Sequence, residues 1–180
     1  MKKNILVVLF ALVVATSAFA GSDPMVGGAA MYPTKNIVEN AANSQDHTTL
    51  VAAVKAAGLV DTLESPGPFT VFAPTNEAFA KLPAGTVEML LKLENKDQLT
   101  AVLTYHVVAG RISANDLARQ IKEGGGKATL KTVNGETLTA SMDGRHIVLT
   151  DSKGNKSMVT IANVFQSNGV IHVVDAVLLP

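Results

Sequence analysis

Two strongly patterned segments constrain the fold of this chain more than any other feature. Residues 67–83 read GPFTVFAPTNEAFAKLP, and residues 168–180 read NGVIHVVDAVLLP. In the first segment, Phe69–Ala73 is a short apolar run rich in β-formers, with a proline on either side. Such a run, bounded by residues that interrupt regular structure, predicts a buried strand.

A short helix is expected directly after this strand. Pro74 cannot donate to a central ladder, so the strand must end there. Thr75 is the predicted N-cap of the helix, because its hydroxyl can accept from a free amide of the first turn. Glu77 in that turn suits the helix dipole, and Phe79 with Leu82 gives one apolar side.

The second segment predicts a strand that is buried on both faces. Its apolar residues alternate without a polar face, which is typical of a central strand. Val170, His172 and Val174 share one face, so His172 is interpreted as a core histidine with hydrogen-bonded nitrogens. Asp175 lies on the other face and is interpreted as a buried structural acceptor.

Together the two segments resemble the two signature boxes of the fasciclin-like domain family. The pair Tyr105-His106 lies between them and matches the third landmark of that family. The resemblance runs from about Asn36 to Pro180 and includes Thr48–Val54 and the phrase LTYHVVAG at Leu103–Gly110. It implies an α+β fold, a wedge of two short β-sheets flanked by several short α-helices, which is used for binding. The structural signature residues are Phe69, Phe72, Pro74, Thr75, Phe79, His172 and Asp175.

The first twenty residues have the pattern of a signal peptide. Lys2 and Lys3 precede the ten apolar residues Ile5–Val14, and Ala18-Phe19-Ala20 is a small-x-small cleavage site. A retained anchor is the alternative, but the apolar run is shorter than the ~20 residues that span a bilayer. We therefore expect a secreted or periplasmic protein that starts at Gly21 and meets the membrane only through this transient segment.

Composition narrows the chemistry that the mature chain can perform. The sequence has no cysteine, so disulfides, thiol chemistry and thiolate metal sites are excluded. Two of the 15 basic residues fall in the signal peptide, which leaves 13 against 15 acidic residues, a formal charge of −2. Without a basic cluster, nucleic acid is not an expected partner. The scarcity of aromatic residues argues against sugar platforms built on exposed rings.

The order of elements predicts one α+β domain. Residues 21–33 are interpreted as a flexible leader and residues 34–180 as the domain. Helices are expected first, with Thr34, Asp46 and Ser113 as N-caps. A glycine run at 124–126 ends the helical region, and turn pairs at 134–135 and 143–144 predict β-hairpins.

Two short motifs are candidates for partner binding. Tyr105-His106 has a structural interpretation, because His106 continues the apolar stripe of Leu99, Val102 and Leu103 to the end of a helix. The family resemblance implies the other interpretation, since this pair is linked to receptor recognition in animal members. Asn95-Lys96-Asp97 also resembles the start of an Asn-Lys-Asp-Ile-Leu recognition sequence of those animal proteins, but Gln98 departs from it. The structural interpretation is a helix start with Asn95 as cap.

No catalytic constellation or metal site emerges. The histidines lack metal-ligand spacing, the serines lack a Gly-x-Ser-x-Gly setting, and the glycine run lacks the Lys-Ser/Thr of a phosphate loop. Together with the signal-peptide pattern, the resemblance to the fasciclin-like family implies an exported, non-enzymatic interaction module of the adhesion or extracellular-matrix type, without a cofactor. Its partner would be an unidentified protein or cell-surface component, and its oligomeric state is open. The alternative is a periplasmic carrier of a small apolar ligand or lipid.

Overall fold

The computed structural model describes residues 23–180. The predicted signal peptide and its cleavage site lie outside these residues. Within them, no helix is both long and apolar enough to cross a membrane.

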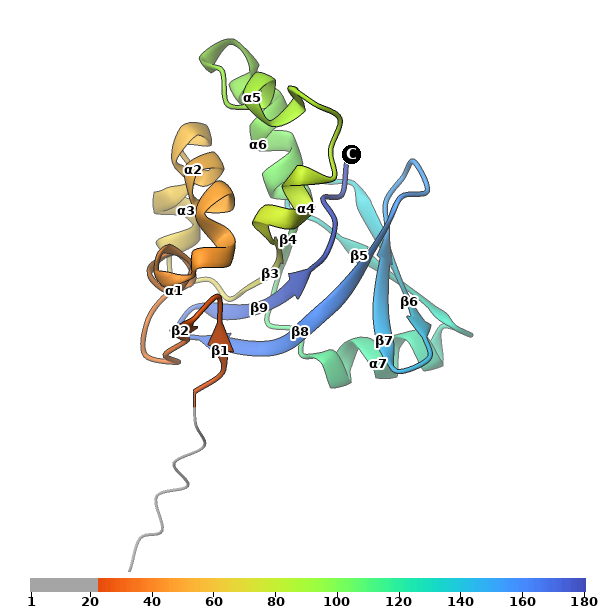
Figure 1. The fold of residues 1–180 in the computed structure, drawn as a ribbon. Coiled ribbons are helices and arrows are strands. Elements are labelled where there is room, and N and C mark those ends of the chain that lie inside the picture. The colour runs from red at the N-terminus through yellow and green to blue at the C-terminus, as the bar shows by residue number, and fades with distance from the viewer. Residues whose placement is uncertain (1–22) are drawn as a thin grey trace, which may run out of the picture.

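The helical elements fill the first two thirds of the described chain (Figure 1). They are α1 (Ile37–Asn43), α2 (Thr48–Ala57), α3 (Val60–Glu64), α4 (Asn76–Ala80), α5 (Thr86–Leu90), α6 (Lys96–Tyr105) and α7 (Ala114–Glu123), with the 3-10 turns η1 (Gln45–His47) and η2 (Leu93–Asn95). The strands are β1 (Met25–Val26), β2 (Ala29–Ala30), β3 (Phe69–Pro74), β4 (Val107–Ala109), β5 (Lys127–Lys131), β6 (Thr137–Asp143), β7 (His146–Thr150), β8 (Lys156–Gln166) and β9 (Gly169–Val174).

The two signature segments meet at the centre of the main sheet. Its strand order is β4-β3-β9-β8-β7-β6-β5, and β3 pairs with β9 in parallel from Phe69↔Gly169 to Pro74↔Val174. The other neighbours in this sheet are antiparallel. A central parallel pair covered on both faces requires apolar side chains throughout, which explains why both segments read as continuous apolar runs.

The predicted two short sheets are two halves of this one sheet, joined by the long strand β8. One end of β8 pairs with β7 and the other with β9, with register shifts between Val159 and Val164 that bend the strand. The sheet curls far enough for Val108 of β4 to form a bridge with Thr132, just after β5. The α+β class and the fasciclin-like architecture predicted from the sequence are thereby confirmed.

The two faces of the central strands enter two different cores. Val71, Ala73, Ile171 and Val173 pack with the helices α1–α6, which lie together on one side of β3 and β9 (Figure 1). Phe72 points the opposite way, into a second core inside the curled half formed by β5–β8. Helix α7 packs against this second core. The molecule therefore has two apolar cores, one on each face of the strand pair β3 and β9.

Several helix caps follow the sequence and two differ from it. Thr75 accepts from the Ala78 amide at 3.2 Å, and Ser113 forms a capping box with Asp116, both as predicted. Helix α1, however, is capped by Asn36 in a capping box with Glu39, two residues after the predicted Thr34. The predicted cap Asp46 lies instead inside η1, and α2 begins without a side-chain cap.

The segment interpreted as a flexible leader contains regular structure where it is described. Strands β1 and β2 form a small antiparallel hairpin, and Val26 and Met31 are buried against the first core. The Asn40 side chain both accepts from the Tyr32 amide and donates to the Tyr32 carbonyl. A flexible leader was predicted because this segment is rich in glycine and lacks a periodic pattern. The hairpin forms because Val26 and Met31 can bury their side chains against the helical core.

Candidate functional site

Tyr105 is completely buried at the end of α6 and connects three elements. Its hydroxyl donates to the Thr137 carbonyl at 3.0 Å and accepts from the Ser152 amide at 3.2 Å. Burial raises the pKa of Tyr105 above its ordinary value, so the phenol stays protonated and keeps its donor. The residue therefore fixes α6 to the start of β6 and to the turn after β7.

His106 follows at the C-cap of α6 and is only 2 % exposed. Its Nε2 lies 3.0 Å from the backbone nitrogen of Leu178, which can only donate, so Nε2 accepts. Nδ1 must then carry the proton that is shared with the Val102 carbonyl at 2.8 Å. Burial lowers the pKa of His106 to about 4, more than the Val102 hydrogen bond and the Asp151 charge raise it. The ring is neutral at pH 7 and acts as a two-sided connector.

Asp151 completes this arrangement, although sequence analysis did not single it out. One carboxylate oxygen accepts from the amides of Lys153 and Asn155, and the other accepts from the Leu179 amide at 3.0 Å. Burial acts to raise the pKa of Asp151, but these hydrogen bonds together hold it below the ordinary value. The signal was present in the sequence: an aspartate four residues before Asn155 in a glycine-containing turn is typical of an Asx-type turn.

His172 is buried in β9 as predicted and joins the segment before α7 to strand β8. Its Nδ1 accepts from the Asn163 amide at 3.2 Å, and Nε2 donates to the Ile112 carbonyl at 2.8 Å. Its ring stacks on Phe72 with 5.7 Å between the centroids. Asn163 has a φ of 60°, so the histidine holds β8 at the irregular part of the strand, where its pairing shifts. Burial lowers the pKa of His172, which keeps the ring neutral.

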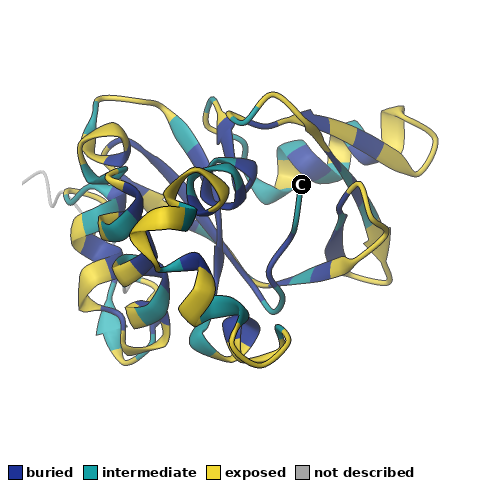
Figure 2. Ribbon diagram, turned by 90° about the horizontal axis from the view of Figure 1, so that it is seen from above, coloured by how far each residue is buried: buried dark blue, intermediate teal, exposed yellow. Residues whose placement is uncertain are grey.

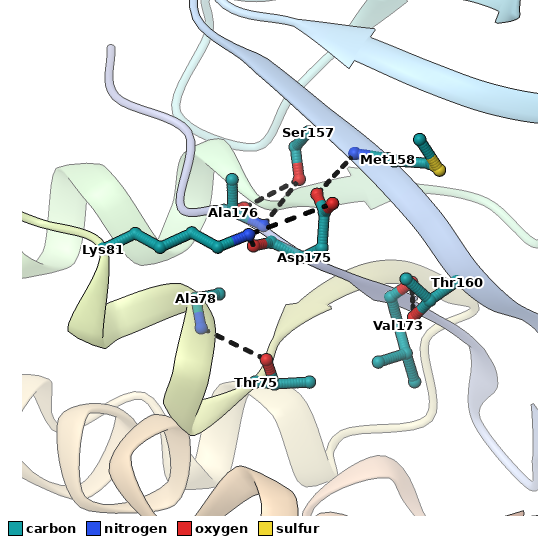
Figure 3. A network of polar contacts seen from close by, with 9 residues as sticks. All are labelled: Thr75, Ala78, Lys81, Ser157, Met158, Thr160, Val173, Asp175 and Ala176. Carbon is teal, nitrogen blue, oxygen red and sulfur yellow. Dashed lines mark hydrogen bonds and ion pairs between the residues drawn. The ribbon is translucent and has the colours of Figure 1, made fainter.

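Asp175 is a structural acceptor, but it is not buried as expected (Figure 3). Its side chain is 38 % exposed, and Oδ1 accepts from the Met158 amide at 2.8 Å. Lys81 donates to the Asp175 carbonyl at 2.7 Å and lies 4.0 Å from the carboxylate. The residue sits just after β9 ends, where the strand alternation that predicted burial no longer holds.

The remaining signature residues hold the strand-to-helix unit together. Phe72, Pro74 and Phe79 are buried, Phe69 is half-buried, and Thr75 caps α4. Asn168 at the start of the second box contributes more than the sequence indicated. It accepts from the Ile37 amide at 3.0 Å and donates to the carbonyls of Leu63 and Ser65, thereby joining α1 and α3 to the sheet.

The motif Asn95-Lys96-Asp97 lies at the far end of α6 from the tyrosine–histidine pair. Asn95 occupies the cap position, but its side chain donates to the Met89 carbonyl at 2.7 Å and makes no cap bond. Lys96 and Asp97 are exposed. Beside them, Leu93 is 86 % exposed and Met89 50 % exposed. We call these five residues, Met89, Leu93, Asn95, Lys96 and Asp97, the α5–η2 tip; it lies at the top of Figure 1.

An apolar groove lies between the first three helices and the end of α6. Its volume is about 50 Å³. Half-exposed Val38, Val51 and Val60 line it, as does His106, and Lys55 is its one cationic lining residue. We call it the α1–α3 groove. The structure therefore separates the predicted partner-binding residues: Asn95, Lys96 and Asp97 reach the surface, while Tyr105 and His106 do not.

The described residues hold no cluster of three histidine or carboxylate side chains able to bind a metal ion. No cofactor or catalytic residue was predicted from the sequence, and the side chains of Tyr105, His106, Asp151 and His172 all take part in structural hydrogen bonds. His47 is the exception: within residues 23–180 it is the buried side chain with a polar atom, Nε2, that lacks a hydrogen-bond partner.

Comparison with known proteins agrees with this architecture. The fasciclin domain model matches residues 45–180. The chain is 52 % identical to Protein sll1483 of Synechocystis sp. over 157 residues, which cover 87 % of this chain and 79 % of that one. It is 35 % identical to the immunogenic protein MPB70 of Mycobacterium bovis, with 96 % and 91 % covered.

A solved structure has the same fold at low sequence identity. It is a FAS1 domain pair from the insect cell adhesion molecule Fasciclin I, which superposes with a TM-score of 0.72 at 20 % identity over 82 % of this chain. The matched part is 52 % of that chain, about one domain of the pair. With the family model spanning most of its length and close relatives matched along nearly all of theirs, this chain belongs to the fasciclin domain family.

Proposed function

We propose that this protein is an exported, non-enzymatic interaction module that binds a protein or cell-surface component through the α5–η2 tip. The observation that carries the proposal is Leu93, a large apolar side chain with 86 % of its surface exposed on an otherwise well-packed domain. A single exposed leucine is ordinary, but here Met89 is exposed beside it.

The surroundings of these two side chains fit a small binding patch. Lys92, Glu94, Lys96 and Asp97 are exposed around them, which gives an apolar centre with a polar rim of both charges. The bond from Asn95 to the Met89 carbonyl fixes the turn between α5 and α6, so the patch is presented in one conformation. Preorganisation of this kind lowers the entropy lost on binding.

Tyr105 and His106 act in this proposal as positioning residues. Both are buried, so a partner that docks on the folded domain touches neither. They fix the C-terminal end of α6 to the sheet and to the chain terminus, and α6 carries Lys96 and Asp97 on its first turn. A mutation at the pair would then disturb binding by loosening the helix that presents the patch.

The expected setting is the periplasm or the outside of the cell, with adhesion or matrix contact as the role. The signal-peptide pattern supports export. The likeness to a domain pair of an insect cell adhesion molecule supports adhesion as the class of activity. A single domain bridges two surfaces only if it self-associates or offers a second binding face, so matrix or envelope attachment is the form of adhesion that we propose.

Site-specific crosslinking tests the tip directly. A photo-crosslinking amino acid is placed at Leu93, and at Phe165 as the control, since Phe165 is 41 % exposed on β8, far along the chain from the tip. In the native envelope we expect position 93 to give one discrete crosslinked product. Position 165 should not give that product. Equal adducts from both positions, or none from position 93 in the native envelope, would refute the tip as the binding surface.

The second candidate function is carriage of a small apolar ligand, and the α1–α3 groove favours it. Its walls are almost entirely apolar, but its volume of about 50 Å³ admits only a few carbon atoms, so a whole ligand would enter only if the helices moved apart. Native mass spectrometry of protein from its own host tests this. Stoichiometric lipid that is lost in a Val51→Phe variant would support carriage, whereas ligand-free protein would argue for the interaction module.

A further inference from the structure

The outer face of the curled half-sheet is uncovered and consists largely of hydroxyl and ammonium groups. Along β5, β6 and β8, buried and exposed residues alternate, and this alternation is visible in the strands of Figure 2. The inward residues belong to the second core with α7. Most of the outward residues are exposed or half-exposed; Val148 of β7, which pairs with Ser141 and Met158, is buried on this face.

Strand register places these outward residues in straight rows. Thr129 pairs with Thr139, Thr139 with Thr150, and Thr150 with Lys156, so one row crosses four strands. A neighbouring pair, Lys131↔Thr137, lies beside it. With strands about 4.8 Å apart, the four-strand row is roughly 14 Å long. We call these six residues the threonine–lysine face.

Charge distinguishes this face from an ordinary solvated strand surface. A third lysine, Lys127, lies on the same face of β5, two residues before Thr129, and pairs with Ser141. The nearby carboxylates are Asp143, at the end of β6, and Asp175, which has Lys81 beside it. Both line a groove of about 460 Å³ that Lys156 also lines. The rows themselves contain no carboxylate, although the mature chain carries more acidic than basic residues.

We propose that the threonine–lysine face binds an acidic polysaccharide. Hydroxyl groups at regular strand spacing can donate to and accept from sugar hydroxyls, and the lysines flanking them complement carboxylate or sulfate groups of the chain. The face is shallow and repetitive, which suits an extended polymer better than a compact ligand. It lies on a different half of the fold from the α5–η2 tip, so it adds a second binding face to the proposed function and is independent of it.

Two other classes of occupant fit the face less well. Single-stranded nucleic acid is bound by aromatic side chains on which bases stack, and the rows contain no aromatic residue. Insertion into a membrane surface requires large apolar side chains at the face, whereas these rows present threonines and lysines.

Titration calorimetry with polygalacturonate tests the proposal, with neutral dextran and single-stranded DNA as comparison polymers. A Lys127→Gln/Lys131→Gln/Lys156→Gln triple variant removes the charge of the face. The matched control, Lys35→Gln/Arg119→Gln/Lys122→Gln, removes the same charge from positions outside this face, the α5–η2 tip and the α1–α3 groove. We expect the first variant to lose roughly 3- to 100-fold in affinity, the sum of three exposed ion pairs, and the control to change by less than about 2-fold.

A second variant tests the hydroxyl groups without altering charge. Thr139→Val/Thr150→Val keeps the β-branched shape and should weaken polygalacturonate binding by roughly threefold or more, with the circular dichroism spectrum unchanged. Binding should also weaken between about 0.05 M and about 0.5 M salt. Equal losses in the two triple variants, unchanged affinity in the threonine variant, absence of binding, or tighter binding of DNA or neutral dextran would each overturn the proposal.

Discussion

The Leu178 amide donates to His106 Nε2 across 3.0 Å, and this one hydrogen bond joins the end of α6 to the last residues of the chain. The Leu179 amide donates to Asp151 beside it, so two successive backbone groups of the C-terminal segment are held by side chains. Leu178 is fully buried in the second core. The His106 ring therefore accepts the hydrogen bond that a neighbouring strand would normally accept, so the buried Leu178 amide is not left without a partner.

Replacing His106 by alanine should lower the free energy of unfolding by about 1–3 kcal/mol, because the Leu178 amide is left buried without an acceptor. Urea denaturation at pH 7 measures this. The control is His146→Ala, at an exposed position, which should change stability by less than about 0.5 kcal/mol. Any loss of partner binding should follow the fraction of unfolded protein. A His106→Ala protein with unchanged stability and no binding would instead make the pair a recognition site.

Stability should fall as the pH drops through the range of histidine titration. The pKa of His106 is about 4 in the folded protein and 6.5 in the unfolded chain, so below pH 6.5 the unfolded state takes up the proton first. Its contribution is fully present above pH 6.5 and is lost progressively toward pH 4, by up to roughly 3 kcal/mol. Burial also lowers the pKa of His47 and His172, which adds to the same trend.

Urea midpoints at pH about 7 and about 4.5 check this pH dependence, with His106→Gln as the non-titrating comparison. Asp116 and Asp151 contribute little in this window, because the pKa of each is lowered from 3.8 and their stabilising effect is lost only at lower pH. We expect the glutamine variant to lose less stability between the two pH values than the wild type. An identical pH dependence in both proteins would show that His106 is not the titrating group.

Phe72→Ala should destabilise the protein by about 3–5 kcal/mol, since the ring is fully buried in the second core and stacks on His172. Phe165→Ala is the matched control and should cost less than about 1 kcal/mol because that ring is half-exposed on β8. Thermal and urea unfolding of both variants give the comparison. Similar small losses in the two would mean that the strand of the first box carries little of the core.

The sequence predicts the centre of this fold better than its edges. Phe69–Ala73 and Val170–Val174 are buried on both faces, and continuous apolar runs report that directly. Burial of His106 follows from the helical stripe that contains Leu99 and Val102. The parallel pairing of the two runs is a long-range contact that leaves no local pattern, and it was not predicted.

Side chains that bond to distant backbone groups were the part that sequence reasoning missed. Asn168 contacts Ile37 and Leu63, more than a hundred residues away, and nothing in its neighbourhood reveals those partners. The same holds for Asp151 and the Leu179 amide. The α5–η2 tip was found only in part: the motif at Asn95 was noted, but the exposure of Leu93 depends on how α5 and α6 pack.

The two signature segments lie close together at Gly169, which leads to a last prediction. Gly169 pairs with Phe69, and a Cβ at position 169 would overlap the Phe69 carbonyl oxygen and press on the Ile37 side chain. Backbone in a central strand pair cannot move aside without breaking its ladder, so Gly169→Ala should cost about 3 kcal/mol, the upper end of overpacking effects.

Gly135→Ala separates this steric effect from the general cost of replacing glycine. Gly135 has a φ of 99° in an open turn with no atom near the added carbon, so only its backbone strain is tested, at about 1–2 kcal/mol. Melting temperatures of the two variants should therefore rank Gly169→Ala below Gly135→Ala. If Gly169→Ala melted at the wild-type temperature, β3 and β9 would have to lie farther apart than their parallel register implies, and close pairing with Phe69 would no longer explain the glycine at position 169.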